Sequence, residues 1–142
     1  MATYFITGTS RGLGLALTKQ LVTLPASQVS LIFASSRGAP SAELKAVIDS
    51  NSDRVKHIIT AVDDAASVQK AVQEVESKLA GRGLDVLVNN AGAAMWSPGG
   101  MKSVTAQDLT KIFETNVGGT QTVTAAFIPL LEKGNLKKVI TL

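Results

Sequence analysis

The sequence predicts an α/β fold in which helices cover both faces of a doubly wound parallel sheet. Three observations predict it. Apolar runs of strand length alternate with longer segments whose apolar residues recur at helical spacing. The strand-length runs are apolar throughout instead of alternating with polar residues, which is typical of parallel strands buried on both faces. Glycine-containing turns follow the first and the fourth run, where such sheets bind their ligands.

The first two strands and helices occupy the N-terminal third of the chain. A strand is expected at residues 3–6, and the helix after it has leucines at helical spacing until Pro25 stops the pattern. Residues 29–34 form a second apolar run of strand length. Ser41 then stands where it can cap a short second helix.

A third strand is expected at residues 55–62 and a fourth at residues 84–88. Between them, Asp64 is placed to cap a helix that ends at the glycines from Gly81 onward. The alternation of strand and helix therefore continues through the middle of the chain.

The last third contains one long helical region and a fifth apolar run. Thr105 and Asp108 resemble a capping box with Asp in place of Glu, and apolar residues recur from there to Leu131. The fifth run covers residues 138–142. Right-handed crossovers between such strands give the order 3-2-1-4-5, with the ligand crevice between the first and fourth strands.

Length and composition favour one folded domain over residues 1–142. The chain is 45% hydrophobic and 18% charged, which is far from the composition of a disordered protein. It has no cysteine, and its single histidine, His57, is interpreted as a partly exposed spacer residue that cannot build a metal site alone. The net charge of +3 is scattered along the chain, so no nucleic-acid partner is expected.

No apolar run is long enough to cross a membrane, and the first residues do not resemble a secretory leader. A cytoplasmic protein without a membrane partner is therefore expected.

The turn after the first strand has glycines at a spacing suited to a phosphate. Gly8 can take a positive φ, Gly12 lets a pyrophosphate approach the backbone, and Gly14 permits close packing of helix on strand. Unpaired N–H groups at the helix start would face the phosphates. The alternative is a tight connection without a ligand. The candidate contacts are Gly8, Thr9, Ser10, Arg11, Gly12, Leu13 and Gly14.

These residues resemble the short-chain dehydrogenase/reductase family. Its Thr-Gly-x-x-x-Gly-x-Gly signature is matched from Thr7 to Gly14, its Asn-Asn-Ala-Gly signature from Asn89 to Gly92, and an Asn of the following helix by Asn116. The matches span the whole chain. The resemblance implies a Rossmann-like fold, a nicotinamide dinucleotide and oxidation or reduction of a small alcohol or carbonyl substrate.

The resemblance also implies roles for single residues. It places Asn90, Ala91 and Gly92 beside the adenine-ribose side of the cofactor, and it gives Asn116 a part in holding a water of a proton relay. The alternative for Asn116 is an amide that satisfies helix backbone at a kink.

Charge at the end of the second strand favours NADP(H) over NAD(H). Residues 33–37 contain no acid that would accept ribose hydroxyls, and they end in Arg37, whose guanidinium suits a 2′-phosphate. Arg11 adds a second cation. A solvated Arg37 is the alternative. Where the family often has an adenine-binding Asp this chain has Ala61, and either Asp63 substitutes for that Asp or it helps to cap the next helix.

The family's catalytic Ser and Tyr-x-x-x-Lys are not found, since the only tyrosine is Tyr4 in the first strand. The expected protein is thus a truncated NADP(H)-dependent oxidoreductase. Two alternatives remain: a non-catalytic cofactor-binding or oligomerising protein, and a non-redox enzyme such as an isomerase or cyclase.

A bare fifth strand and an uncovered long helix predict self-association. Trp96, in the loop after the second signature, is interpreted as a packing anchor.

Overall fold

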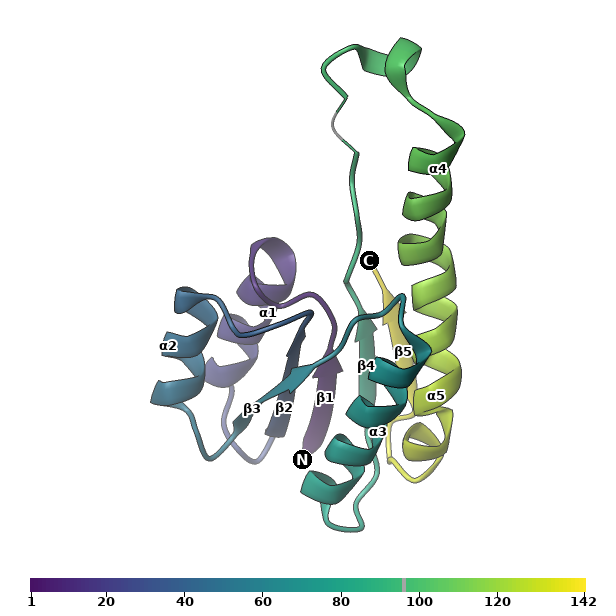
Figure 1. The fold of residues 1–142 in the computed structure, drawn as a ribbon. Coiled ribbons are helices and arrows are strands. Elements are labelled where there is room, and N and C mark those ends of the chain that lie inside the picture. Colours follow the sequence, from purple (N-terminus) through teal and green to yellow (C-terminus); the bar gives the residue numbers. More distant parts are fainter. Residues whose placement is uncertain (96) are drawn as a thin grey trace.

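The computed structural model describes residues 1–95 and 97–142, and its elements alternate as expected (Figure 1). The strands are β1 (Ala2–Ile6), β2 (Val29–Ser36), β3 (Val55–Ile59), β4 (Val86–Asn89) and β5 (Lys138–Thr141). The helices are α1 (Gly12–Thr23), α2 (Ala42–Ser50), α3 (Ala65–Leu79), α4 (Ala106–Phe113) and α5 (Thr120–Glu132), with a short 3₁₀ turn, η1 (Gly100–Ser103), and a π-helical turn, η2 (Glu114–Gly119).

The strands form one parallel sheet in the order β3-β2-β1-β4-β5, which confirms the predicted topology. β1 is the middle strand, and Phe5 lies opposite Phe33 of β2 and Leu87 of β4. The order of the strands reverses between β1 and β4, so the loops that follow these two strands meet at the same edge of the sheet.

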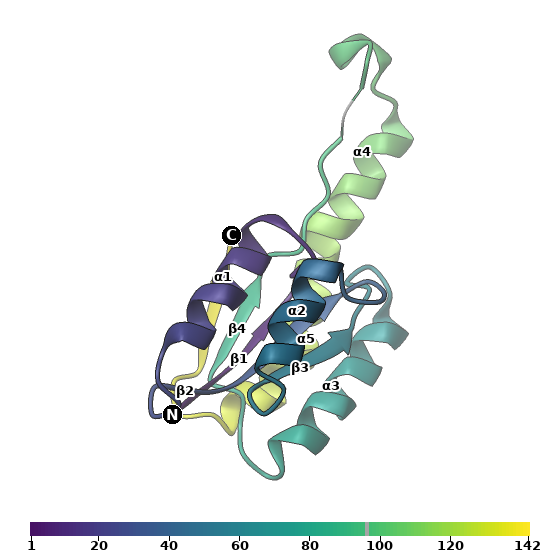
Figure 2. The same cartoon turned by 90° about the vertical axis from the view of Figure 1, so that its left-hand side faces the viewer.

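Two apolar layers hold the helices against the sheet. Helices α1 and α2 cover one face, and α3 and α5 cover the other (Figure 1, Figure 2). On the second face the rings of Phe5 and Phe127 lie 4.3 Å apart, and both side chains are fully buried. Burial of large side chains on both faces of β1 accounts for its continuous apolar sequence.

The N-caps predicted at Ser41, Asp64 and Thr105 are formed. The Ser41 hydroxyl accepts from the Leu44 amide at the start of α2. The Asp64 carboxylate accepts from two first-turn amides of α3. At α4, Thr105 and Asp108 form both halves of a capping box. These side chains satisfy N–H groups that have no partner within the helix.

Strand β3 is shorter than predicted, since it ends at Ile59 and not at residue 62. The Thr60 amide still donates to the Ser36 carbonyl, but the Ala61 amide donates to the Ser67 hydroxyl of α3. A side chain of the next helix thus replaces the neighbouring strand as the hydrogen-bond partner, and the chain turns away from the sheet.

The long helical region predicted up to Leu131 is divided by the π-helical turn η2. Gly119, at the end of this turn, lies against Val62, and a Cβ at Gly119 would come within 2.8 Å of Val62 Cγ2. Such turns are rare and often occur at functional sites. Helix α4 and the turn η1 extend beyond the carboxyl ends of the strands (Figure 1).

The carboxylate of Asp85 joins the start of β1 to the segment that precedes β5, at the end of the sheet opposite the cavity. It accepts from the amides of Thr3 at 2.9 Å, Asn135 at 2.7 Å and Leu136 at 3.2 Å, and also from the Thr3 hydroxyl. Burial raises the pKa of this carboxyl, but these hydrogen bonds outweigh that effect and hold the pKa below its ordinary value of 3.8.

Strand β5 is the outermost strand beside β4, and all four of its residues are exposed. Val139 and Ile140 are 46% and 41% exposed, respectively. This arrangement is the bare apolar edge expected from the sequence. Within the described residues, no helix has both the length and the apolar character needed to cross a bilayer.

Candidate cofactor site

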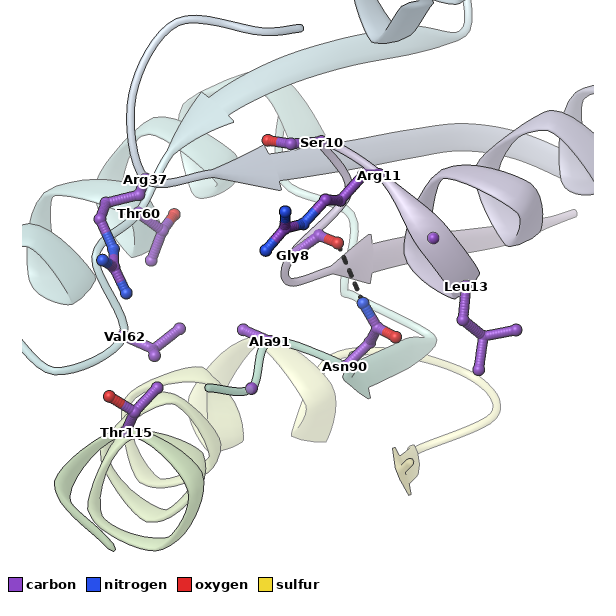
Figure 3. Close-up of a pocket in the computed structure, with 12 residues that line it drawn as sticks. Gly8, Ser10, Arg11, Leu13, Arg37, Thr60, Val62, Asn90, Ala91 and Thr115 are labelled. Carbon is purple, nitrogen blue, oxygen red and sulfur yellow. Dashed lines mark hydrogen bonds between the residues drawn. The ribbon is translucent and has the colours of Figure 1, made fainter. Parts of the chain in front are cut away.

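Hydrogen bonds lock the glycine-rich loop to the turn after β4. The Asn90 side-chain amide donates to the Thr7 carbonyl at 2.9 Å. It also donates to the Gly8 carbonyl at 3.0 Å (Figure 3). In return, the Thr7 hydroxyl accepts from the amides of Asn90 and Ala91. The two loops that carry the sequence motifs are therefore one connected unit at the carboxyl ends of β1 and β4.

Two glycines allow this contact. Gly8 has a φ of +73°, and a Cβ there would lie 2.8 Å from Ala91 Cα. A Cβ at Gly14 would lie 2.4 Å from Asn90 Nδ2 and 2.5 Å from the Gly8 carbonyl oxygen. No side chain fits at either position, so α1 begins pressed against both loops, as predicted for Gly14.

A cavity of about 460 Å³ opens at this junction. Most of the predicted contact residues line it: Gly8, Ser10, Arg11, Gly12, Leu13, Arg37, Asn90, Ala91 and Gly92. Thr60, Val62 and Thr115 complete the lining. No residue of this lining carries a negative charge, so the cavity is electrostatically suited to an anion.

The start of α1 offers hydrogen-bond donors to such an anion. Among the described residues, no side chain caps this helix, whose N-cap residue is Arg11, and its first turn contains no acid. The backbone N–H groups of that turn therefore have no side-chain acceptor, and the helix dipole adds partial positive charge. Gly12 has a φ of +59°, and a Cβ there would meet nothing within 4 Å, which leaves the approach to these N–H groups open.

Two arginines point into the cavity from separate loops. Arg11 extends from the glycine-rich loop, and Arg37 extends from the loop after β2 (Figure 3). Both are exposed, and the ion pairs between described residues all join other side chains. The two guanidinium groups can therefore bind a phosphate within the cavity.

Some predicted contacts do not fit the geometry. Thr9 is fully buried, and both its amide and its hydroxyl donate to the Ser35 carbonyl at 2.9 Å, so Thr9 fixes the loop and does not face the cavity. Gly14 also lies outside the lining, because it is covered by Asn90 and Gly8. Thr9 and Gly14 therefore support the loop that lines the cavity without lining it themselves.

Asp63 lies in an adjoining cleft, which also includes Arg37 and Thr115, and it is not part of the main lining. Its place beside the adenine stays a prediction. The alternative role of Asp63 as a helix cap is wrong, because it is Asp64 that accepts from the amides of Ala66 and Ser67.

Asn116 holds the loop that follows the second motif. Its Oδ1 accepts from the Ala93 amide at 2.7 Å, and its Nδ2 donates to the Ala93 carbonyl at 3.0 Å. The side chain therefore bonds to loop backbone, and not to helix backbone as the kink alternative required. The Asn116 carbonyl accepts from the Thr120 hydroxyl.

The sequence does not predict Thr60, Val62 and Thr115 as part of the site. The first two belong to the longer third strand that the sequence predicts, and they enter the cavity because β3 ends early. Thr115 enters from the π-helical turn, which the sequence pattern does not mark. Trp96, predicted as a packing anchor, lies outside the described residues.

The model of the family described as short chain dehydrogenase matches residues 2–142. The chain belongs to this family. Its relatives include a short-chain dehydrogenase/reductase of Aspergillus aculeatus, 35% identical over 152 aligned positions. A second, from an Arthrinium species, is 32% identical. The alignments cover 100% and 99% of this chain but 54% of each relative.

Two solved structures of carbonyl reductases have the same fold. The NADPH-bound carbonyl reductase from chicken fatty liver is 29% identical, with a TM-score of 0.82 over 94% of this chain and 49% of that chain. The carbonyl reductase Sniffer of D. melanogaster is 31% identical, with a TM-score of 0.84 over 94% of this chain and 53% of that chain. The chain thus spans about half the length of the proteins it resembles.

Proposed function

We propose that these residues form the NADP(H)-binding half of a short-chain reductase that acts on a carbonyl or alcohol substrate. The observation that carries the proposal is the cavity at the carboxyl ends of β1 and β4, which combines a helix N-terminus with two arginines and no acid. A dinucleotide phosphate would find backbone donors at α1, and its 2′-phosphate would find Arg37.

The preference for NADP(H) rests on charge. NAD(H)-binding sites of this fold commonly have an acid at the end of the second strand, where its carboxylate accepts from the ribose hydroxyls. Here β2 ends in Ser35 and Ser36, and Arg37 follows. A cation at this position favours the additional phosphate of NADP(H) over a free hydroxyl. The NADPH-bound carbonyl reductase with the same fold supports this choice.

We further propose that these 142 residues bind the cofactor without reducing a carbonyl by themselves. The family resemblance assigns proton transfer to a Tyr-x-x-x-Lys pair. The only tyrosine here is Tyr4, which lies half-buried within β1 and away from the cavity lining. When bound, the nicotinamide supplies or accepts hydride, while the residues of this chain bind and orient it.

The proposal is tested by isothermal titration calorimetry of the full chain with NADPH and NADH. We expect saturable binding of both, with NADPH tighter by about tenfold or more, because a charge-assisted hydrogen bond contributes about 1.5–3 kcal/mol. Gly12→Asp is the matched control, since it places a negative charge where the pyrophosphate would lie. No saturable binding by the unmodified chain would contradict the proposal, and equal affinities would contradict the preference.

A self-associating protein that binds the cofactor without catalysis is the second candidate. The exposed apolar residues of β5 favour it, and so do Phe113 and Val117, which are 63% and 51% exposed. A cytoplasmic location and the absence of a nucleic-acid partner stay predictions from the sequence.

A further inference from the structure

A buried serine connects the Arg37 loop to the edge of the sheet. Ser36 is the last residue of β2 and is 3% exposed. Its hydroxyl donates to the Gly38 carbonyl at 2.8 Å, so this hydrogen bond spans Arg37. The same hydroxyl oxygen lies 2.6 Å from Nε2 of His57 on β3. One hydroxyl thus closes the turn around Arg37 and also contacts the histidine.

The number of hydrogens decides the direction of the second contact. A hydroxyl has one hydrogen, and that of Ser36 is directed at the Gly38 carbonyl. His57 Nε2 must then carry a hydrogen and donate it to Ser36 Oγ. In the opposite arrangement, Ser36 would donate to His57 and would release Gly38. The N–H of His57 therefore holds Ser36 Oγ from the side of β3, while the hydrogen of Ser36 stays on the Gly38 carbonyl.

The surroundings of His57 are consistent with a fixed donor. Burial lowers the pKa of His57 below its ordinary value, although the carboxylate of Glu74 opposes this effect. A neutral ring has one N–H, and a hydrogen bond at one nitrogen determines which tautomer is present. Ser36 supplies that bond.

The far end of the same loop is also anchored. The Ser41 hydroxyl donates to the Ser10 carbonyl at 2.7 Å, which joins the loop to the glycine-rich turn. Between Ser36 and Ser41, the direction of the Arg37 side chain depends on the backbone of the turn, because the ion pairs of the described residues join other side chains. A change at Ser36 is therefore passed on to Arg37.

We propose that His57 is a positioning residue for cofactor choice: through Ser36 it holds the turn that directs Arg37 into the cavity, and it thereby strengthens the preference for NADP(H). His57 does not line the cofactor cavity, so it acts only through this contact. The assignment rests on the proposed function.

The test compares binding of NADPH and NADH by calorimetry for the full chain and for His57→Leu, His57→Gln and Ser36→Ala. We expect His57→Leu and Ser36→Ala each to lower the NADPH-over-NADH affinity ratio by about three- to tenfold, the range for loss of one hydrogen bond, with NADH affinity unchanged. His57→Gln should restore the ratio, because its amide also donates. In the double variant that combines Ser36→Ala and His57→Leu, the affinity ratio should fall no further than in either single variant.

Lys56→Gln is the matched control, since Lys56 is the neighbouring residue on β3 and its side chain donates to the carbonyl of the exposed Ser52. An unchanged ratio in both His57→Leu and Ser36→Ala overturns the assignment, and so does an equal loss of NADPH and NADH affinity, which indicates a general structural role. If the unmodified chain binds neither cofactor, the proposed function fails as well; if it prefers NADPH and the variants keep that preference, only the role of His57 fails.

Discussion

The side chain of Asn116 pairs with the backbone of Ala93 through two hydrogen bonds, of 2.7 Å and 3.0 Å. Ala93 directly follows the motif that lines the cavity at the ends of β1 and β4, and Asn116 lies in the π-helical turn before α5. The pair therefore fixes the distance between the Asn-Asn-Ala-Gly turn and the helix that covers it. Residues distant in sequence are held together here by one amide group.

Asn116→Ala should release this loop. It leaves the Ala93 amide without its acceptor, and a hydrogen bond of this kind contributes about 0.5–1.5 kcal/mol. We expect faster hydrogen exchange of the Ala93 amide, with little change at the helix core. Gln121→Ala, on the exposed side of α5, is the control. Unchanged protection at Ala93 would show that the pair does not hold the loop in solution.

Gly14→Ala should be one of the most damaging single-methyl additions. The new Cβ would overlap Asn90 Nδ2 and the Gly8 carbonyl, and overpacking of this kind costs about 1–3 kcal/mol. The measurement is the free energy of unfolding from urea denaturation, together with NADPH affinity, which should fall because the two motif loops separate. Gly118→Ala is a matched control, since a Cβ there meets nothing within 4 Å. Equal stability of the two variants would refute the close packing.

Asp85 predicts a loss of stability in acid. Its pKa is lower in the folded chain than in the unfolded chain, so its contribution is fully present above the ordinary value of 3.8 and is lost as the pH falls through the lower, folded value. Asp85→Asn removes the charge. Thermal unfolding of both proteins is measured between about pH 2 and pH 7. The unmodified chain should have the higher unfolding temperature at neutral pH, and this difference should decrease in acid. A difference that stays constant with pH would argue against the charged carboxylate.

The exposed edge of β5 predicts association between copies of the chain. Ile140→Lys places a charge on this edge, which opposes pairing with another strand. Sedimentation velocity should show oligomers of the unmodified chain at micromolar concentration and a shift toward monomer in the variant. Lys138→Gln, at the start of the same strand, is the control. A monomer in every case would remove the argument for self-association.

Features that depend on local sequence were predictable. Caps need a polar side chain beside a few backbone amides, so Ser41, Asp64 and the Thr105–Asp108 box were found by position alone. The strand order followed from the parallel strands and the handedness of their connections.

Features that depend on contacts distant in sequence were not predictable. Strand β3 ends early because Ser67 of the next helix takes the Ala61 amide. The π-helical turn is supported by the close approach of Gly119 to Val62. These two deviations bring Thr60, Val62 and Thr115 into the cavity, which is why the sequence pattern did not mark them as part of the site.

The central claim is that NADP(H) binds between the start of α1 and the turn after β4. Two-dimensional ¹H–¹⁵N NMR during titration with NADPH tests it most directly, because each backbone amide reports separately. Saturable shifts should centre on the amides of Gly12, Leu13, Arg37, Ala91 and Gly92. Saturable shifts that instead centre on the separate groove along α5 lined by Thr124 and Ile128, or no shifts at all, would contradict the claim.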